Sequence, residues 1–233
     1  MEIYTDLGIA RKKERRLVHN FIKELPINLS IGQVYIVNSA IALQIDKPGF
    51  ARNTLQFSSF DAVLSNFSND TRKLKKNNTL SISLTSKLFR RVPLSLVANF
   101  DMTDPRESYV YRGSLGAMNL TELSPLLTAM KEMKIKEGKL ISLDWDVSAN
   151  STKSSGWLDF EYDDFEIAQN NKKGIKDMDL LKFVATKLLV SRNNLHGQYF
   201  VRGDVSASRS SNQSMFFHMW ESIYSGIEST LKP

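Results

Sequence analysis

Cysteine is absent from this chain, so no disulfide can hold its fold and no thiol can serve as a nucleophile or a metal ligand. Long hydrophobic runs are absent too, because no stretch approaches the roughly 18 uncharged apolar residues that a membrane-spanning helix requires. Residues 1–9 lack the basic and then apolar pattern of a secretory signal peptide. We therefore expect any export or membrane anchoring to depend on sequence that is missing here.

The motifs that commonly mark an enzyme are also missing. The eleven glycines are scattered and form neither a Gly-x-Gly-x-x-Gly fingerprint nor a Gly-Lys-Ser/Thr phosphate loop. The histidines are His19, His196 and His218. Only His218 has a possible metal ligand at helical spacing, Glu221, and two ligands without a third do not make a zinc site. The sequence predicts a protein that is not an enzyme and that carries no cofactor and no metal.

The net charge of +6 and an isoelectric point near 9.4 would permit a nucleic acid or an anionic lipid surface as a partner. The basic residues, however, lie in short runs, at residues 11–16, in the Asn-rich segment 72–76 and at residues 90–91. No aromatic residues are interleaved with them to stack bases. We expect these runs to be solvated surface, and we expect no nucleic-acid partner.

Hydrophobic residues alternate with polar ones from Ile27 onwards, which is typical of antiparallel strands with one apolar face and one wet face. The pattern predicts a hairpin that turns at Asn38-Ser39. It predicts further strands at about residues 54–66, 80–85, 94–102, 108–117, 138–147, 158–162 and 199–205. The expected fold class is mainly β with a few α-helices: a curved antiparallel sheet, an open groove or taco-like shape, capped by helices.

Helical periodicity occurs in four segments: residues 10–25, which end before Pro26, and residues 121–133, 177–190 and 213–233. In the last of these, five residues recur at steps of three and four and predict an amphipathic helix: Phe216, Trp220, Ile223, Ile227 and Leu231. We divide the chain into a helical lead-in (1–26), a β-groove domain with inserted helices at about 121–133 and 177–190 (27–212), and a C-terminal amphipathic helix (213–233).

The apolar face of the terminal helix needs a hydrophobic surface to cover it. It could close the open end of a groove, lie in a bilayer interface with Phe216, Phe217 and Trp220 buried, or dock onto a protein. The polar side carries Glu221, Glu228 and Lys232, which does not favour attraction to anionic lipid. We expect Phe216, Trp220, Ile223 and Ile227 to form a docking surface, with protein as the preferred partner.

A dense set of acids comprises Asp144, Asp146, Asp159, Glu161, Asp163 and Asp164. If the strands that contain them pair, these carboxylates gather on the face opposite Trp145 and Phe160. A carboxylate pair could hydrolyse a glycoside or bind a hard cation. Strand alternation places polar residues there in any case, so the sequence favours a solvated outer face.

Several stretches together resemble one family. They are residues 25–31 (LPINLSI), 37–41 (VNSAI), 55–57 (LQF), 62–66 (AVLSN), 136–140 (KEGKL), 156–165 (GWLDFEYDDF) and 214–227 (SMFFHMWESIYSGI). They are similar to the C-terminal region of the AsmA-like and TamB-like proteins of Gram-negative envelopes, in their Bacteroidota form. The resemblance covers nearly the whole chain from Leu25. The chain departs from the family in lacking a membrane anchor and most of the length.

The resemblance implies a β-sheet groove in a periplasmic protein that is anchored in the inner membrane and takes part in outer-membrane biogenesis by moving phospholipid. The expected function is a non-enzymatic lipid-binding or lipid-transfer segment, with phospholipid acyl chains as cargo and an envelope protein as a partner of the C-terminal helix. The expected groove lining is Leu80, Ile82, Leu84, Leu94, Leu96, Phe100, Ile141, Leu143, Trp145, Leu158 and Phe160.

Three alternatives stay open. The same residues could pack under the helices as a closed core. The chain could be an envelope scaffolding module that recruits proteins through an open sheet edge. It could also be a carbohydrate-active β-protein that uses the acids around Asp144 and Asp159.

Overall fold

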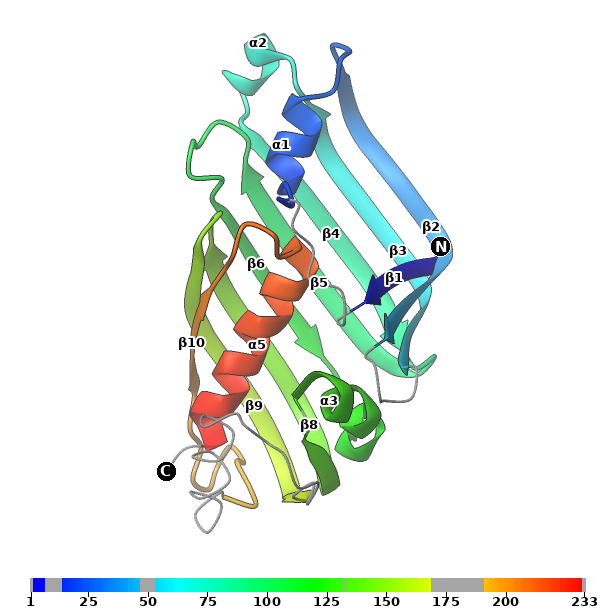
Figure 1. Ribbon diagram of the computed structural model, residues 1–233, viewed down its shortest axis with the longest axis vertical. Helices are drawn as coiled ribbons and strands as arrows, with labels where there is room; N and C mark the ends of the chain where they lie inside the picture. The colour runs from blue at the N-terminus through cyan, green and yellow to red at the C-terminus, as the bar shows by residue number, and fades with distance from the viewer. Residues whose placement is uncertain (1, 7–13, 47–52, 132, 169–190, 232–233) are drawn as a thin grey trace.

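A single ten-stranded sheet forms the body of the computed structural model, which describes residues 2–6, 14–46, 53–131, 133–168 and 191–231 (Figure 1). The strands are β1 (Glu2–Asp6), β2 (Ser30–Asp46), β3 (Asn53–Ser68), β4 (Thr79–Leu88), β5 (Val92–Asp101), β6 (Tyr109–Leu115), β7 (Met118–Asn119), β8 (Lys134–Ala149), β9 (Lys153–Ala168) and β10 (Gly203–Ser208). Their order is β1-β2-β3-β4-β5-β6-β8-β9-β10, with β7 paired to β8. Neighbours are antiparallel except β1, which runs parallel to the end of β2. The expected mainly β fold with an open, curved antiparallel sheet is confirmed.

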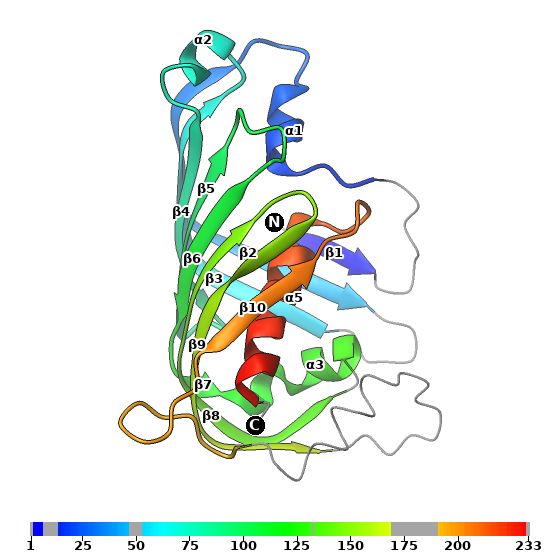
Figure 2. The ribbon, with the colours of Figure 1, turned by 90° about the vertical axis from the view of Figure 1, so that its left-hand side faces the viewer.

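The longer helices lie on the concave side of the sheet. In Figure 1, α1 (Val18–Lys23) lies near the upper end, α5 (Met215–Leu231) runs beside β9 and β10, and the 3-10 turn η1 (Leu120–Leu123) leads into α3 (Ser124–Lys131) lower down. Figure 2 shows these helices inside the curve of the sheet, whereas the short α2 (Thr71–Leu74) lies at the upper tip. The sheet therefore has a concave face that helices partly cover and a convex face toward solvent.

Cross-strand register places apolar residues of eight strands in rows on the concave face, because directly paired residues share a face. One row consists of Val34, Leu64, Ile82, Ala98, Tyr111, Val147, Gly156 and Val205. The next consists of Ile36, Ala62, Leu84, Leu96, Gly113, Trp145, Leu158 and Gly203. The predicted alternation therefore builds one apolar surface that runs from β2 to β10.

Of the segment 10–25 that was predicted to be helical, the structure describes residues 14–25. Within this part only Val18–Lys23 is helical. Leu17 is extended, with ψ of 166°, so the helix begins only at Val18. The backbone N–H of Arg15 donates to the carbonyl of Ser211, 2.7 Å away, which ties the preceding chain to the loop before α5 instead of into a helical turn. Leu17 and Ile22 are buried, whereas Phe21 is 61% exposed.

The predicted hairpin at Asn38-Ser39 is wrong, because β2 is one strand from Ser30 to Asp46. A two-residue hairpin turn of type I′ needs two consecutive left-handed residues. Here only Asn38 has a positive φ, of 42°, and the register to β3 shifts on both sides of Ser39. The carboxylate of Asp61 accepts the Asn38 N–H at 2.8 Å and holds this distortion as a β-bulge.

A second bulge corrects the prediction that Ile141 shares a face with Trp145. Leu140 pairs with Tyr162 and Ser142 with Glu161, so β8 has one extra residue between these pairs. That extra residue inverts the alternation. Leu140 is therefore buried on the concave face, while Ile141 is 42% exposed on the other.

The remaining elements agree with the sequence more closely at the centre than at the ends. The strands expected at 54–66, 80–85 and 94–102 are confirmed as β3, β4 and β5, and Pro125 lies in the first turn of α3. Strand β3 extends to Ser68, slightly beyond the predicted end, and α2 follows it. Tyr199 and Val201 precede β10 instead of lying in a strand. The helix expected at 177–190 lies outside the described residues.

Candidate functional site

The concave face divides into a covered half and a partly open half. Along the second row described above, Ile36 on β2 is 38% exposed and Leu84 and Leu96 are half-buried, whereas Trp145, Leu158 and Gly203 are buried. We call the covered region of β6, β8, β9 and β10 the closed wing, and the region of β2 to β5 the open wing. Burial is not uniform within the open wing, since Ala62 and Ala98 are buried there, but the half-buried large side chains of these two rows lie on the wing that α5 does not cover.

Helix α5 docks on the closed wing through small residues. A Cβ atom at Gly226 would lie 2.9 Å from side-chain atoms of both Leu158 and Val205, and one at Gly203 would lie 2.2 Å from the Gly226 carbonyl oxygen. The hydroxyl oxygens of Ser222 and Ser154 are 2.7 Å apart and buried. Backbone and helix therefore approach as closely as glycine permits.

Serines of α5 also cover the outer edge of β10. The backbone N–H of Asp204 donates to the Ser229 hydroxyl, and that of Ser206 donates to the Ser225 hydroxyl, each at 3.1 Å. These are outward-pointing groups of the last strand, which would otherwise remain open for a further strand. The helix thus replaces a missing neighbour strand at this edge.

A buried aromatic cluster joins α1 and α5 to the closed wing. The Tyr109 hydroxyl lies 3.2 Å from Nδ1 of His218, and His19 Nε2 lies 3.1 Å from the Ser108 carbonyl oxygen. The His19 and Phe100 rings pack edge to face with centroids 5.4 Å apart. Both histidines are fully buried, and this burial lowers the pKa of each below the ordinary value of 6.5. Each is neutral at pH 7 and serves in packing.

Helix α3 is linked to α5 by a cation on an aromatic ring. Lys131 Nζ lies 2.9 Å from the Glu221 carboxylate and 4.3 Å from the centre of the Tyr224 ring. These contacts orient one side of α5 toward α3. The hydrophobic residues of α5 then lie between the contact with α3 and the contact with β10.

An apolar crevice opens where these parts meet the open wing. It is lined by Leu43, Ile45, Leu55, Leu126, Met130, Ser214, Phe216, Phe217 and Trp220. The enclosed space between these side chains is about 10 Å³, roughly the room of one water molecule, and the rest of the crevice is open to solvent. The half-buried inner residues of β4 and β5 lie on the same concave face, and we call the crevice together with these residues the trough.

The predicted lining residues fall into three groups. Ile82, Leu84, Leu94 and Leu96 are half-buried and line the trough. Leu80, Phe100, Leu143, Trp145, Leu158 and Phe160 are buried in the core. Ile141 lies on the convex face because of the bulge in β8. The expectation of a closed core therefore holds for the closed wing and for Leu80 and Phe100 of the open wing, and only the four half-buried residues remain accessible lining.

The predicted docking stripe of the terminal helix is also only partly covered. Phe216 is 46% exposed, and Trp220, Ile223 and Ile227 are half-buried against the core. Against the sheet, the helix docks by the flank that carries His218, Ser222 and Gly226, so docking of the stripe on a partner stays a prediction. Close approach of the two backbones explains this choice, since only small side chains fit there.

The acid cluster forms ion pairs on the convex face. Asp146 accepts from Arg112 at 2.6 Å, and Asp159 accepts from Arg202 at 2.7 Å. The Arg202 guanidinium lies 4.2 Å from the centre of the Trp157 ring. The expected polar outer face is confirmed, and Asp146 pairs across β6 and β8 while Asp159 pairs with an arginine that precedes β10.

Several trough residues were not identified from the sequence. Leu43, Ile45 and Leu55 line it because the bulge at Asn38 keeps β2 continuous and carries its second half around the curve. Their alternation was visible, but the bulge that places them opposite α5 was not. The spacing of Ser222 and Gly226, four residues apart on one helix flank, was the available signal for the docking contact.

Within the described ranges, no three His, Asp or Glu side chains gather closely enough to bind a metal ion. No helix in the described part of the chain has the length and apolar character needed to cross a bilayer. Comparisons with protein-family models, with curated proteins and with solved structures gave no match.

Proposed function

We propose that this chain is a non-enzymatic lipid-binding or lipid-transfer segment whose trough shelters phospholipid acyl chains. The half-buried residues Ile82, Leu84, Leu94 and Leu96 of the open wing carry the proposal, together with the apolar crevice between β2, β3, α3 and the start of α5. The resemblance to AsmA-like proteins supports the same function, and with it a place in the periplasm within a parent protein that is anchored in the inner membrane.

The lining has the chemistry that hydrocarbon needs. Of the residues lining the crevice, only Ser214 is polar. Each methylene that leaves water for such a surface contributes about 0.8 kcal/mol, without any directional contact. A chain held in this way is free to shift along the surface, which suits transfer better than fixed binding.

The absence of cysteine allows a test with one label at a time. A fluorescent label attached to the cysteine of Leu96→Cys would lie in the trough. The same label on Val97→Cys would lie on the convex face, because adjacent residues of a strand point to opposite faces. We expect a fatty acid with a spin-labelled tail to quench the first label strongly and the second weakly. Equal quenching at both positions would refute an acyl-chain site in the trough.

Substitutions test the same point without a label. Leu84→Ser with Leu96→Ser changes a cross-strand pair of the trough, and Val97→Ser with Ile141→Ser changes two residues on the convex face that are 43% and 42% exposed. We expect the first pair to abolish binding of a fluorescent fatty acid and the copurification of lipid, and the second pair to change neither.

A second candidate function is an envelope scaffolding module, and the free edge of β2 favours it. In the part of the chain that the structure describes, Ser30–Val37 pairs with β3 on one side and with no strand on the other. This stretch has no charged residue and no proline, and Tyr35 and Val37 are 62% and 70% exposed. A protein that purifies without lipid but forms complexes through this edge would favour scaffolding.

A further inference from the structure

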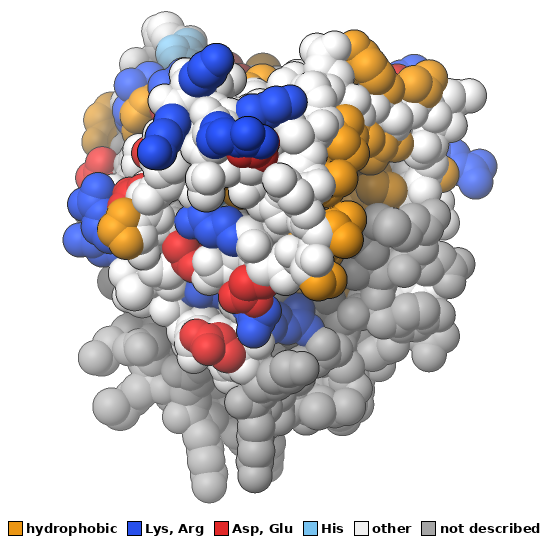
Figure 3. Space-filling model, turned by 90° about the horizontal axis from the view of Figure 1, so that it is seen from above, with side chains coloured by type: hydrophobic (Ala, Val, Ile, Leu, Met, Phe, Trp, Pro, Cys, Tyr) orange, Lys and Arg blue, Asp and Glu red, His pale blue; other side chains and the backbone are white. Residues whose placement is uncertain are grey.

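The upper end of the molecule combines two kinds of exposed side chain. Figure 3 looks down on this end and shows Lys and Arg side chains gathered over one part and hydrophobic side chains along another. The basic part includes Lys73, Lys75 and Lys76, all exposed, in and after α2. The apolar part includes Phe21 on α1 and Ile27 after it, which are 61% and 60% exposed.

Hydrogen bonds hold these two parts against each other. The side-chain amide of Asn69 donates to the Ile27 carbonyl at 2.8 Å, and its oxygen accepts the Leu29 N–H at 2.7 Å. The Asn69 N–H donates to the Leu29 carbonyl at 3.0 Å. Asp70, the next residue, caps α2 by accepting the Arg72 N–H. The segment that carries Ile27 is therefore fixed beside the basic helix.

Three carboxylates at this end are paired with arginines, whereas Asp101 and Glu107 accept hydrogen bonds from neutral groups. Asp70 lies 3.4 Å from Arg72 and Asp104 lies 3.3 Å from Arg106, while Glu24 pairs with Arg16. Lys73, Lys75 and Lys76 form no ion pair with another described residue. An anionic surface would meet three free ammonium groups beside two large apolar side chains.

We propose that this end docks on the surface of an anionic lipid bilayer, with Phe21 and Ile27 inserted among the lipids and the lysines of α2 on the headgroups. Basic groups attract anionic lipid, and adjacent apolar side chains add burial that a soluble polyanion cannot provide. The inference rests on the proposed function in one respect, since the trough lies below this end and docking would bring it to its lipid source.

Vesicle binding tests the proposal on the whole chain. Vesicles of phosphatidylcholine with phosphatidylglycerol, and vesicles of phosphatidylcholine alone, would be sedimented with the protein at low and at high salt. Each lysine near an anionic surface contributes about fivefold in partitioning, so Lys73→Gln with Lys75→Gln and Lys76→Gln should lose about a hundredfold. Phe21→Ser with Ile27→Ser should also lose binding, and the loss should persist at every salt concentration.

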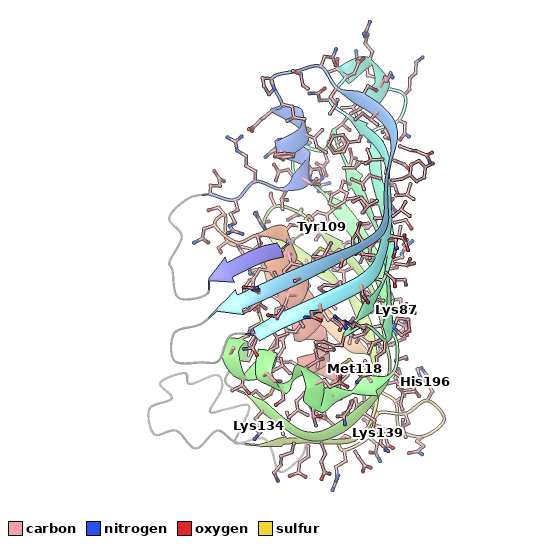
Figure 4. All side chains as sticks on the ribbon, turned by 90° about the vertical axis from the view of Figure 1, so that its right-hand side faces the viewer. Lys87, Tyr109, Met118, Lys134, Lys139 and His196 are labelled. Carbon is pink, nitrogen blue, oxygen red and sulfur yellow. The ribbon has the colours of Figure 1, made fainter. Side chains whose placement is uncertain are left out.

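A matched control removes the same charge elsewhere. Lys87, Lys134 and Lys139 are exposed, and Figure 4 shows them well below the upper end. Replacing these three by Gln should leave vesicle binding within about threefold of the original, since they are too far from a docked surface to be felt through the Debye length. If this control loses as much binding as the α2 variant, net charge alone explains the result and the proposal fails.

Binding of a fluorescent fatty acid without vesicles separates this inference from the proposed function. The α2 variant should keep fatty-acid binding while it loses vesicle binding. If fatty-acid binding is absent but vesicle docking follows the predictions, the trough function fails and docking stands. Equal binding to both kinds of vesicle would overturn docking. So would tighter binding to a single-stranded DNA oligonucleotide that Phe21→Ser with Ile27→Ser leaves unchanged.

Discussion

The two edges of the sheet are finished in opposite ways. At β10 the helix α5 supplies hydroxyl acceptors to outward N–H groups and packs glycine against glycine. At β2 the described chain offers Ser30–Val37 no second partner, and the exposed residues there are uncharged. One edge is closed by its own chain, whereas the other has none of the charges or prolines that usually protect an edge. The difference indicates that stability is concentrated at β10 and that contact with other molecules is expected at β2.

The same contrast runs across the concave face. Paired residues in one row pass from half-buried Leu84 and Leu96 to fully buried Leu158. A substitution at equivalent positions of the two wings should therefore have unequal effects on the free energy of unfolding.

The largest effect is expected from a side chain between β10 and α5. Gly203→Val would place a Cβ 2.2 Å from the Gly226 carbonyl oxygen, so α5 must move away. We expect a loss of about 3 kcal/mol in the free energy of unfolding. The control is Gly32→Val in the opposite edge strand, where a Cβ meets nothing within 4 Å and valine suits a strand. Urea unfolding of both variants checks the comparison, and equal losses would contradict it.

A pH-dependent effect is expected from the buried histidines that join α1 and α5 to the sheet. Burial lowers the pKa of His19 and His218, so below the unfolded value of 6.5 the unfolded chain binds more protons than the folded one. The free energy of unfolding should therefore fall as the pH falls below 6.5, until the folded pKa values are passed.

The limiting slope of this loss is about 1.4 kcal/mol per pH unit for each histidine. Urea unfolding at pH 7, 6 and 5 measures it, and His218→Gln should show about half the slope. Asp104, whose pKa is lowered to about 2 chiefly by a hydrogen bond from Ser108, should add its own loss only below about pH 4. A free energy of unfolding that is flat from pH 7 to pH 5 would contradict the account.

A smaller loss is expected at the β10 edge when its hydroxyl acceptors are removed. Ser225→Ala with Ser229→Ala leaves the N–H groups of Ser206 and Asp204 without these partners. The cost should be about 1 kcal/mol for each hydrogen bond. Amide hydrogen exchange should quicken at residues 204 and 206 and stay unchanged at 156 and 158 on β9. No change in exchange at 204 and 206 would show that the serines do not protect this edge.

The smallest effect on folding is expected at the β2 edge. Tyr35→Lys with Val37→Lys places charges on exposed positions, so the free energy of unfolding should change by less than about 0.5 kcal/mol. Any association through this edge should nevertheless decrease, because charged side chains oppose strand pairing. Light scattering over a concentration series measures this. Association that persists unchanged would indicate contact through another surface.

The sequence predicted the sheet more reliably than its curvature. Alternation identifies strands such as β4 and β5, because one apolar face per strand suffices to define them. Bulges leave a much weaker signal: Asn38-Ser39 has the composition of a turn, and only the single left-handed residue makes it a bulge. An extra residue at Ile141 is likewise invisible until Leu140 and Ser142 have partners. Both features depend on neighbouring strands rather than on local preference.

The candidate site was predictable in chemistry but not in extent. Four of the expected lining residues remain accessible, while Leu158 and Phe160 are buried, because the position of α5 decides which apolar residues are covered. Its periodic stripe indicated a contact through large residues, whereas Gly226 permits the closer approach. Which face of this helix packs on the sheet, the one with large side chains or the one with small side chains, depends on tertiary packing and cannot be read from its periodicity.

The small residues and the large hydrophobic residues of α5 lie on different flanks of the helix, which affects how its sequence can evolve. The close contacts of Ser222 and Gly226 fix the helix on β9 and β10, whereas Trp220, Ile223 and Ile227 are only half-buried against the core. Exchanges among those three hydrophobic residues would alter the apolar surface of the helix while the contacts of the small residues stay in place. Drift along that stripe should thus be tolerated far more readily than any replacement of the small residues beside it.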